Sequence, residues 1–418
     1  MPAFGTNLDQ PGGESFTFAR HTKAYVMFRM KHLLTLSLIA VFLLSTSAYA
    51  QQVPDSLNMV PNGSFEETEG KLRRLGSIAM AKEWNSPTGA NADLYSESVD
   101  ASSPAYAPRN ANGFQSALSG INYAGLRWYS FMDKEPRSYL QVKFKKMLKK
   151  DQKYCISYYV SLGELSRYSS DHLGAYVSRV VVNKKDETSL TYGAQVPDLK
   201  SKVYDDMDGW QGVCGIYEAK GDEQYLIIGN FAATDKVNAG KTRRPKGEVR
   251  PQRPDAYYFI DDVSVKPVKL LSECSCEQID KDKSEFIYGR KMTAQPGLSP
   301  TQRVDRSVIY FKRFNKDIDP SMVAQMDSLA SVLVANPAIK VNLTGHTDVK
   351  EVERSSMRPD LNDLGQGRAE IIKAHLVQAG VAADRIILAD KRGTAPAAQG
   401  ADEVSTSQNR RVEVDVVK

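Results

Sequence analysis

The stretch Gly345-His346-Thr347-Asp348 follows the alternating run Ile339-Lys340-Val341-Asn342-Leu343, as expected for a β-strand that ends in a polar loop. Further on, Leu364-Gly365-Gln366-Gly367-Arg368-Ala369 opens a helical pattern, and Asn409-Arg410-Arg411-Val412-Glu413-Val414 begins a strand. These stretches place a carboxylate and two guanidinium groups at the ends of elements that can converge. Since carboxylate binds ammonium and guanidinium binds carboxylate in bidentate fashion, a small zwitterion is the natural ligand of such a set.

Helices and strands alternate around these stretches. Asp319-Pro320 starts a helix, with Asp as the N-cap and Pro in the first turn, and apolar residues then recur at helical spacing until Asn336-Pro337. The remaining predicted elements are the strands Val308–Phe311, Arg385–Ala389 and Arg411–Val417 and the helix Leu364–Ala379. This βαβαββ order predicts an α/β domain over residues 306–418, with both helices on one face of the sheet.

Taken together, the Gly-His-Thr-Asp string, the Leu-x-x-x-Arg-Ala helix start and the Asn-Arg-Arg-Val-Glu ending resemble the OmpA-like peptidoglycan-binding domain. The resemblance covers nearly all of residues 305–418. It implies that Asp348 binds the ammonium and Arg368 the carboxylate of diaminopimelate in the stem peptide of peptidoglycan. It also implies supporting contacts from Thr347 and Arg410. The free N–H groups at the start of the helix favour an anion there as well.

The chain departs from the family pattern at several positions. Leu361 stands where the family has an Asn, so that Asn362 is displaced by one residue, and Gly365 replaces a Ser. The loop between Asp348 and Arg368 is longer than usual and highly charged. These departures bear on affinity and ligand geometry. The alternative is that Asp348 and Arg368 form only an internal salt bridge.

The region from residue 51 to 268 has short aromatic and β-branched runs separated by Gly, Asn, Asp and Pro, which predict an all-β antiparallel sandwich. It opens with Val60-Pro61-Asn62-Gly63-Ser64-Phe65-Glu66 and closes with the run Tyr257 to Val265. With Trp210 to Val213 and Ile227 to Phe231, these segments resemble the galactose-binding-like jelly rolls of carbohydrate-binding modules in Bacteroidetes-type envelope proteins.

The last predicted strand of this region contains a buried acid. Strand alternation puts Phe259, Asp261, Val263 and Val265 on one face, the expected core face, and a buried carboxylate needs a cation or several donors. The jelly-roll resemblance implies a structural calcium held by Glu66 and Asp261, with Asp262 as the substitute ligand. The alternative is that these acids accept backbone hydrogen bonds.

The first 50 residues predict export. A basic segment precedes the apolar run Leu33 to Leu44, and Ser47-Ala48-Tyr49-Ala50 supplies a cleavage site, so residues 1–50 are interpreted as an upstream extension and a signal peptide. No cysteine follows the predicted cleavage site, which argues against a lipid anchor. We therefore expect a periplasmic protein associated with the outer membrane or cell wall.

Export permits disulfides among the four cysteines. Cys155 and Cys214 both lie in strand-like runs, so a bridge between them is favoured, while Cys274 and Cys276 form a candidate local pair. Polar residues 269–305, with Pro296, Gly297 and Pro300, are interpreted as a linker. An alternative for Cys274 and Cys276 is that they tether this linker to the first domain.

Length, net charge and predicted export limit the classes of function that we expect. With 418 residues and a net charge of +5, the chain is a mildly basic, multidomain protein. The basic run Lys236 to Arg253 is interpreted as a solvated loop, since an exported protein rarely meets nucleic acid. We expect a non-enzymatic protein that anchors to peptidoglycan, with a sandwich that binds a glycan or an envelope protein. The alternatives are a glycan hydrolase, for which only Glu164, Asp171 and His172 are candidates, and a structural subunit of an outer-membrane complex.

Overall fold

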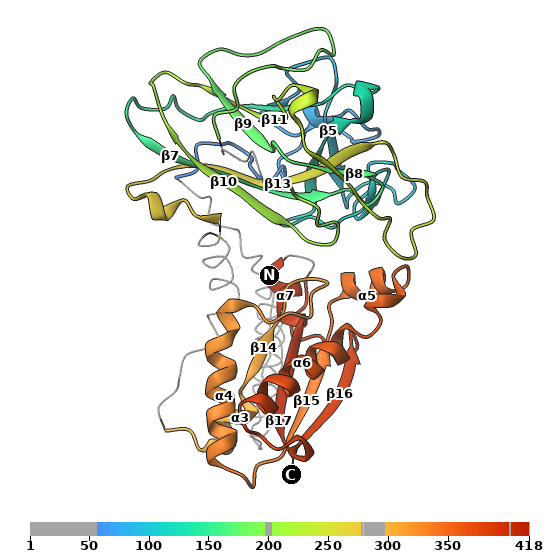
Figure 1. Ribbon diagram of the computed structural model, residues 1–418, viewed down its shortest axis with the longest axis vertical. Helices are drawn as coiled ribbons and strands as arrows, with labels where there is room; N and C mark the ends of the chain where they lie inside the picture. Colours follow the sequence, from blue (N-terminus) through green and yellow to red (C-terminus); the bar gives the residue numbers. More distant parts are fainter. Residues whose placement is uncertain (1–56, 197–202, 277–278, 280–296, 401–402, 418) are drawn as a thin grey trace, which may run out of the picture. The chain divides into compact units, whose positions relative to one another are not determined.

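The computed structural model describes residues 57–196, 203–276, 279, 297–400 and 403–417 (Figure 1). The predicted signal peptide and the middle of the predicted linker lie outside the described residues. Within those residues, no helix combines the length and the apolar character needed to cross a bilayer.

The N-terminal region consists of two main antiparallel sheets and two short strand pairs. Its strands are β1 Trp84–Asn85, β2 Asp93–Ser96, β3 Arg109–Asn110, β4 Gly113–Phe114, β5 Asn122–Ser130, β6 Leu140–Lys143, β7 Lys153–Leu162, β8 Tyr168–Ser170, β9 Gly174–Ser178, β10 Gln211–Glu218, β11 Tyr225–Gly229, β12 Ala239–Lys241 and β13 Asp255–Pro267. The sheet orders are β10-β7-β13-β5-β2 and β1-β6-β11-β9, with β8 paired to β12 and β3 to β4. One core takes side chains from both main sheets, such as Trp128 and Leu226. The all-β prediction is confirmed, and the packed sheets fit a jelly roll.

Strand β13 departs from simple alternation. Val263 and Val265 join the sandwich core, whereas Phe259 packs in a separate aromatic cluster. The pairing of β13 with β7 shifts register after Asp261, and Asp262 has a φ of 52°. This β-bulge reverses the faces of the following residues. The prediction of one shared face is therefore wrong, although Asp261 is buried as expected.

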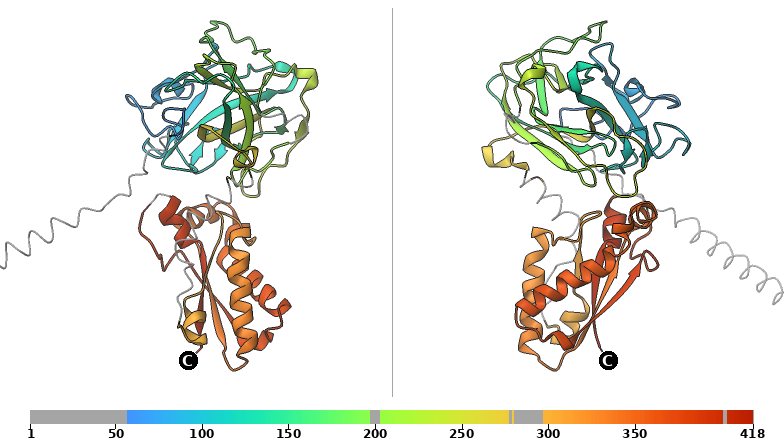
Figure 2. Two further views of the ribbon diagram at one scale, coloured as in Figure 1. Left: turned by 90° about the vertical axis from the view of Figure 1, so that its left-hand side faces the viewer. Right: turned by 45° about the vertical axis from the view of Figure 1, so that its right-hand side comes forward.

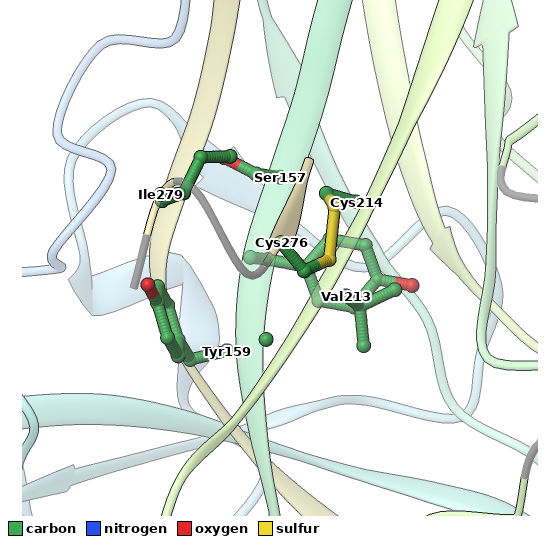
Figure 3. Close-up of a pocket in the computed structure, with 8 residues that line it drawn as sticks. Ser157, Tyr159, Val213, Cys214, Cys276 and Ile279 are labelled. Carbon is green, nitrogen blue, oxygen red and sulfur yellow. A yellow bond between two sulfur atoms is a disulfide. The ribbon is translucent and has the colours of Figure 1, made fainter. Parts of the chain in front are cut away.

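The two cysteines of the Cys-Ser-Cys string are each bonded to a sandwich strand. Cys274 is bonded to Cys155 in β7, and Cys276 to Cys214 in β10. Figure 3 shows the Cys214–Cys276 bridge. Both predicted pairings, Cys155 with Cys214 and Cys274 with Cys276, are wrong, whereas the alternative of a tether from Cys274 and Cys276 to the first domain is confirmed. Cys214 faces Ser157 in the sheet rather than Cys155, so the two strand cysteines are offset along their strands.

The C-terminal region is an α/β domain. Its elements are α3 Pro300–Asp305, β14 Val308–Tyr310, α4 Val323–Ala335, β15 Val341–His346, α5 Val349–Ser355, α6 Leu364–Gln378, β16 Ile386–Arg392, α7 Glu403–Asn409 and β17 Arg411–Val416. The sheet order is β14-β17-β15-β16, with β15 and β16 parallel and the other pairs antiparallel. Helices α4 and α6 pack on the sheet in a single core (Figure 2). The predicted βαβαββ pattern is confirmed, and α3, α5 and α7 are additions to it.

Two glycines bring the start of α6 against the end of β15. A Cβ atom on Gly345 would lie 2.0 Å from the carbonyl oxygen of Gly365, so only glycine permits this approach. On Gly365, a Cβ atom would meet a carboxylate oxygen of Asp390 at 2.2 Å. The first turn of α6 thus lies beside an anion of the chain itself and beside the loop that carries Asp348.

Candidate functional site

Asp348 lies at the C-terminal end of β15 and caps α5. Its Oδ1 accepts the backbone N–H of Glu351 at 2.7 Å, and its Oδ2 accepts Arg410 Nη1 at 2.7 Å. Arg313 Nε lies 3.6 Å from the same Oδ2. Burial alone would raise the pKa of the Asp348 carboxyl, but Arg410 and Arg313 outweigh it and hold this pKa below its ordinary value. Asp348 is therefore an ionised, fully engaged carboxylate.

Arg368 is completely buried on α6 and already binds a carboxylate. Its Nη1 and Nη2 donate to Oε2 and Oε1 of Glu351 at 2.9 and 2.5 Å, in the bidentate arrangement that guanidinium favours. The rest of the guanidinium donates to the backbone carbonyls of Asn315, His346 and Lys312. These carbonyls fix the plane of the guanidinium and its position.

The Glu351 carboxylate occupies an anion hole formed by Arg368 and two backbone N–H groups. Besides the two Arg368 bonds, its Oε1 accepts the N–H of Phe314 at 2.8 Å, and its Oε2 accepts the N–H of Asp348 at 3.2 Å. Glu351 and Asp348 thereby cap each other's backbone in a reciprocal capping box. One guanidinium and two backbone N–H groups together form a site for a single carboxylate.

The other predicted contact residues divide into two groups. Thr347 and Arg410 flank Asp348, and the buried hydroxyl of Thr347 has no hydrogen-bond partner among the described residues. Asn362 is exposed, in the turn before α6, and is not part of this hydrogen-bonded cluster in the described part of the chain. Asp348 and Arg368 do not pair with each other in the described structure, because each has its own partner. The alternative, a direct salt bridge between Asp348 and Arg368, is therefore wrong.

Two residues of the cluster are absent from the prediction. Glu351 fell in a segment interpreted as a polar loop, and Arg313 follows the first strand of the domain. A signal for Glu351 was present in the sequence, because Asp348 and Glu351 have the spacing of a capping box. The pairing of Arg313 and Arg410 with Asp348 depends on strand order, which the sequence pattern does not reveal.

The acids proposed for calcium in the sandwich bind backbone N–H groups. Glu66 Oε1 accepts the N–H groups of Ile121 and Asn122 at 3.0 and 2.9 Å. Asp261 Oδ2 accepts those of Leu118 and Ser119 at 2.9 and 3.1 Å. Each acid is therefore held by main-chain donors, as the alternative to calcium requires.

Asp261 is buried, whereas Glu66 is exposed and only its carboxyl is partly desolvated. Among the described residues, no cation is one of the main electrostatic influences on either acid. Desolvation, with a contribution from nearby acids, raises the pKa of Glu66 to about 7 and that of Asp261 well above its ordinary value. Asp262 contributes to both shifts by charge repulsion. A cation would relieve this repulsion, yet the described residues contain no group of three or more potential ligand side chains able to hold a metal. The calcium site stays a prediction.

The residues considered for hydrolysis have structural contacts. His172 Nδ1 lies 2.6 Å from Asp171 Oδ1, which also accepts the N–H of Asn238. Glu164 is buried and its Oε2 accepts the N–H of Phe114 at 2.9 Å. These contacts account for the placement of the acids without requiring a substrate.

The fold and the cluster define an α/β domain in which an aspartate after the second strand and an arginine on a following helix surround a carboxylate site. Residues 310–410 match the model of the OmpA family. The chain is 31% identical over 145 residues to the peptidoglycan-associated lipoprotein of Pasteurella multocida, covering 34% of this chain and 88% of the relative. This chain belongs to the OmpA family through its C-terminal domain.

Solved structures match each region at low TM-scores. The peptidoglycan-associated lipoprotein of Burkholderia pseudomallei is 24% identical with a TM-score of 0.25, over 29% of this chain and all of that one. The CBM22-1 xylan-binding domain of Paenibacillus barcinonensis Xyn10C is 14% identical with a TM-score of 0.27, over 50% of this chain and 93% of that one. The family assignment rests on the sequence matches.

Proposed function

We propose that this chain is a non-enzymatic cell-envelope protein whose C-terminal domain binds peptidoglycan non-covalently. In this proposal Arg368 binds the carboxylate and Asp348 the ammonium of diaminopimelate in the stem peptide. Thr347 and Arg410 support these contacts, and Asn362 contributes at the rim. The protein is exported through the signal peptide of residues 1–50 and resides in the periplasm, at the cell wall or outer membrane.

The anion hole around Arg368 is the observation that carries this proposal. The guanidinium of Arg368 and two backbone N–H groups already hold one carboxylate, that of Glu351, beside the ionised Asp348. The unpartnered hydroxyl of Thr347 supplies a further contact for a ligand at the same place. The name of a similar lipoprotein states association with peptidoglycan, which supports peptidoglycan as the partner proposed here.

Sedimentation with purified sacculi tests the proposal. Arg368→Lys keeps the charge but loses the bidentate geometry, and Asp348→Asn keeps a capping oxygen but loses the charge. We expect each to weaken binding by about ten- to a hundredfold, as for a lost charged hydrogen bond. Arg303→Lys and Asp384→Asn, at exposed positions of the same domain, are the matched controls. Sedimentation of both site variants like the wild type, with unchanged circular dichroism, would contradict the proposal.

The β-sandwich is proposed to bind a glycan or an envelope protein, possibilities that one experiment separates. The full chain carrying Asp348→Asn, which silences the C-terminal site, is applied to a glycan array. Binding to a glycan class supports the first role, and its absence together with co-purification of an envelope protein supports the second. Dye release from labelled peptidoglycan by the wild-type chain would instead revive the hydrolase alternative.

A further inference from the structure

Glu351 presents to Arg368 and Asp348 the same two kinds of group that an amino-acid ligand would present, a carboxylate and an N–H donor. Its side-chain carboxylate fills the hole made by Arg368 and the N–H groups of Phe314 and Asp348. Its own backbone N–H donates to Asp348 Oδ1 at 2.7 Å, the oxygen that a ligand ammonium would use. A donor and a carboxylate from one residue thus satisfy the two halves of the site.

We propose that Glu351 is an internal stand-in for the zwitterionic ligand, so that ligand binding and the first turn of α5 exclude each other. This inference rests on the proposed function and adds its regulation. A ligand carboxylate displaces the Glu351 carboxylate from Arg368, and a ligand ammonium replaces the Glu351 N–H at Asp348. Arg410 keeps its bond to the other oxygen of Asp348, so that carboxylate stays ionised and in place.

Helix α5 is built so that this exchange is feasible. It has seven residues, which is too short to be stable in isolation. Its buried side chains are all charged, namely those of Lys350, Glu351 and Arg354. Its valines Val349 and Val352 are 65% and 42% exposed. Because apolar burial contributes little here, polar contacts hold its first turn, and the capping box and the Arg368 pair are among them.

The expected consequence is a reduced affinity in the wild-type chain. A ligand that binds only the open form has its apparent dissociation constant increased by the inverse of the fraction that is open. A change that weakens the hold of Glu351 therefore tightens binding, although it deletes a contact of the folded protein. This sign is the opposite of the one expected for a residue that supports ligand binding directly.

Calorimetric titration of the full chain with meso-diaminopimelic acid tests the inference through two variants that open α5 differently. Glu351→Gln keeps the shape of the side chain but removes the charge that Arg368 binds. Val352→Pro keeps the charge and removes the bond from the Val352 N–H to the Asp348 carbonyl. We expect each to bind at least tenfold more tightly than the wild type. Glu353→Gln, an exposed position of the same helix, is the matched control and leaves affinity unchanged.

Amide hydrogen exchange supplies the second measurement. Ligand should speed exchange of the Glu351 and Val352 amides, which lose their acceptors on Asp348. If the wild type binds while both variants, folded by circular dichroism, bind equally or more weakly, the stand-in role is overturned and the proposed function stands. If neither the wild type nor either variant binds the amino acid or sediments with sacculi, the proposed function falls and this inference with it.

Discussion

The carboxyl pKa values of two groups of acids in this chain are shifted in opposite directions. In the C-terminal domain, Asp348 faces Arg410 and Arg313, and its pKa is held below its ordinary value. In the sandwich, Glu66 and Asp261 accept backbone N–H groups, but desolvation and the charges of neighbouring acids raise the pKa values of both carboxyls. Backbone donors satisfy lone pairs but do not cancel the cost of burying charge. The difference identifies the first group as an ion-pair network, whereas calcium binding by the second group stays a prediction.

Removal of Arg368 should have the largest effect, because it breaks the ion-pair network. Arg368→Ala leaves the Glu351 carboxylate buried without its cation, and we expect a loss of about 3–5 kcal/mol in the free energy of unfolding. Urea denaturation monitored on the C-terminal transition measures it, with Arg303→Ala as the exposed control. A loss below about 1 kcal/mol would show that the network contributes little to stability.

Calcium should affect only the sandwich. If Glu66 and Asp261 bind the ion, calcium at a hundred times its dissociation constant stabilises the sandwich by about 2.7 kcal/mol. Differential scanning calorimetry in calcium and in chelator measures the shift, and the C-terminal transition serves as the internal reference. An unchanged melting temperature for the sandwich in chelator would remove the calcium proposal.

Neutralising Asp261 in chelator should not lower the free energy of unfolding appreciably, in contrast to the loss expected when Arg368 is removed. Asp261→Asn removes a charge that burial and Asp262 both disfavour. The amide oxygen still accepts the N–H groups of Leu118 and Ser119, and one hydrogen bond, from the Asp262 N–H to Oδ1, is lost. We expect the free energy of unfolding to stay within about 1 kcal/mol of the wild type or to rise. Destabilisation well beyond that range would mean that the charge itself is bound in the native protein.

The smallest effect should be a pH dependence at Glu66. Partial desolvation of its carboxyl, with repulsion from Glu97 and Asp262, raises its native pKa from 4.5 to about 7, so between these values the native state holds a proton that the unfolded state has lost. This group's contribution to stability therefore falls as the pH rises from about 4.5 to about 7. In chelator, the melting temperature of Glu66→Gln relative to the wild type should increase across this window and level off above it. A flat difference would contradict the raised pKa.

The sequence predicted the C-terminal fold well because its elements carry strong periodic signals. Apolar spacing marked α4 and α6, and the string around Asp348 marked the end of β15. Helix α5 escaped notice because its buried side chains are charged and give no apolar stripe. In the sandwich, alternation failed after Asp261 because a bulge reverses the faces without any glycine or proline to announce it.

The sequence predicted which residues form the candidate site, but not which of them pair with each other. Asp348, Arg368 and Arg410 were assigned from motifs, yet the partner of each depends on which loops meet in space. The same reason explains the cysteines, since four thiols allow three pairings and local strand character does not choose among them.

The two bridges at Cys274 and Cys276 determine how the sandwich responds to tension. A pull on the chain beyond Cys276 is transmitted through sulfur to β10 and β7 rather than along the end of β13. The segment between Cys214 and Cys276 cannot be drawn out while its bridge is intact, whatever happens to the hydrogen bonds of the sheet. If the C-terminal domain binds peptidoglycan as proposed, these bridges make the sandwich resistant to unfolding from its C-terminal side.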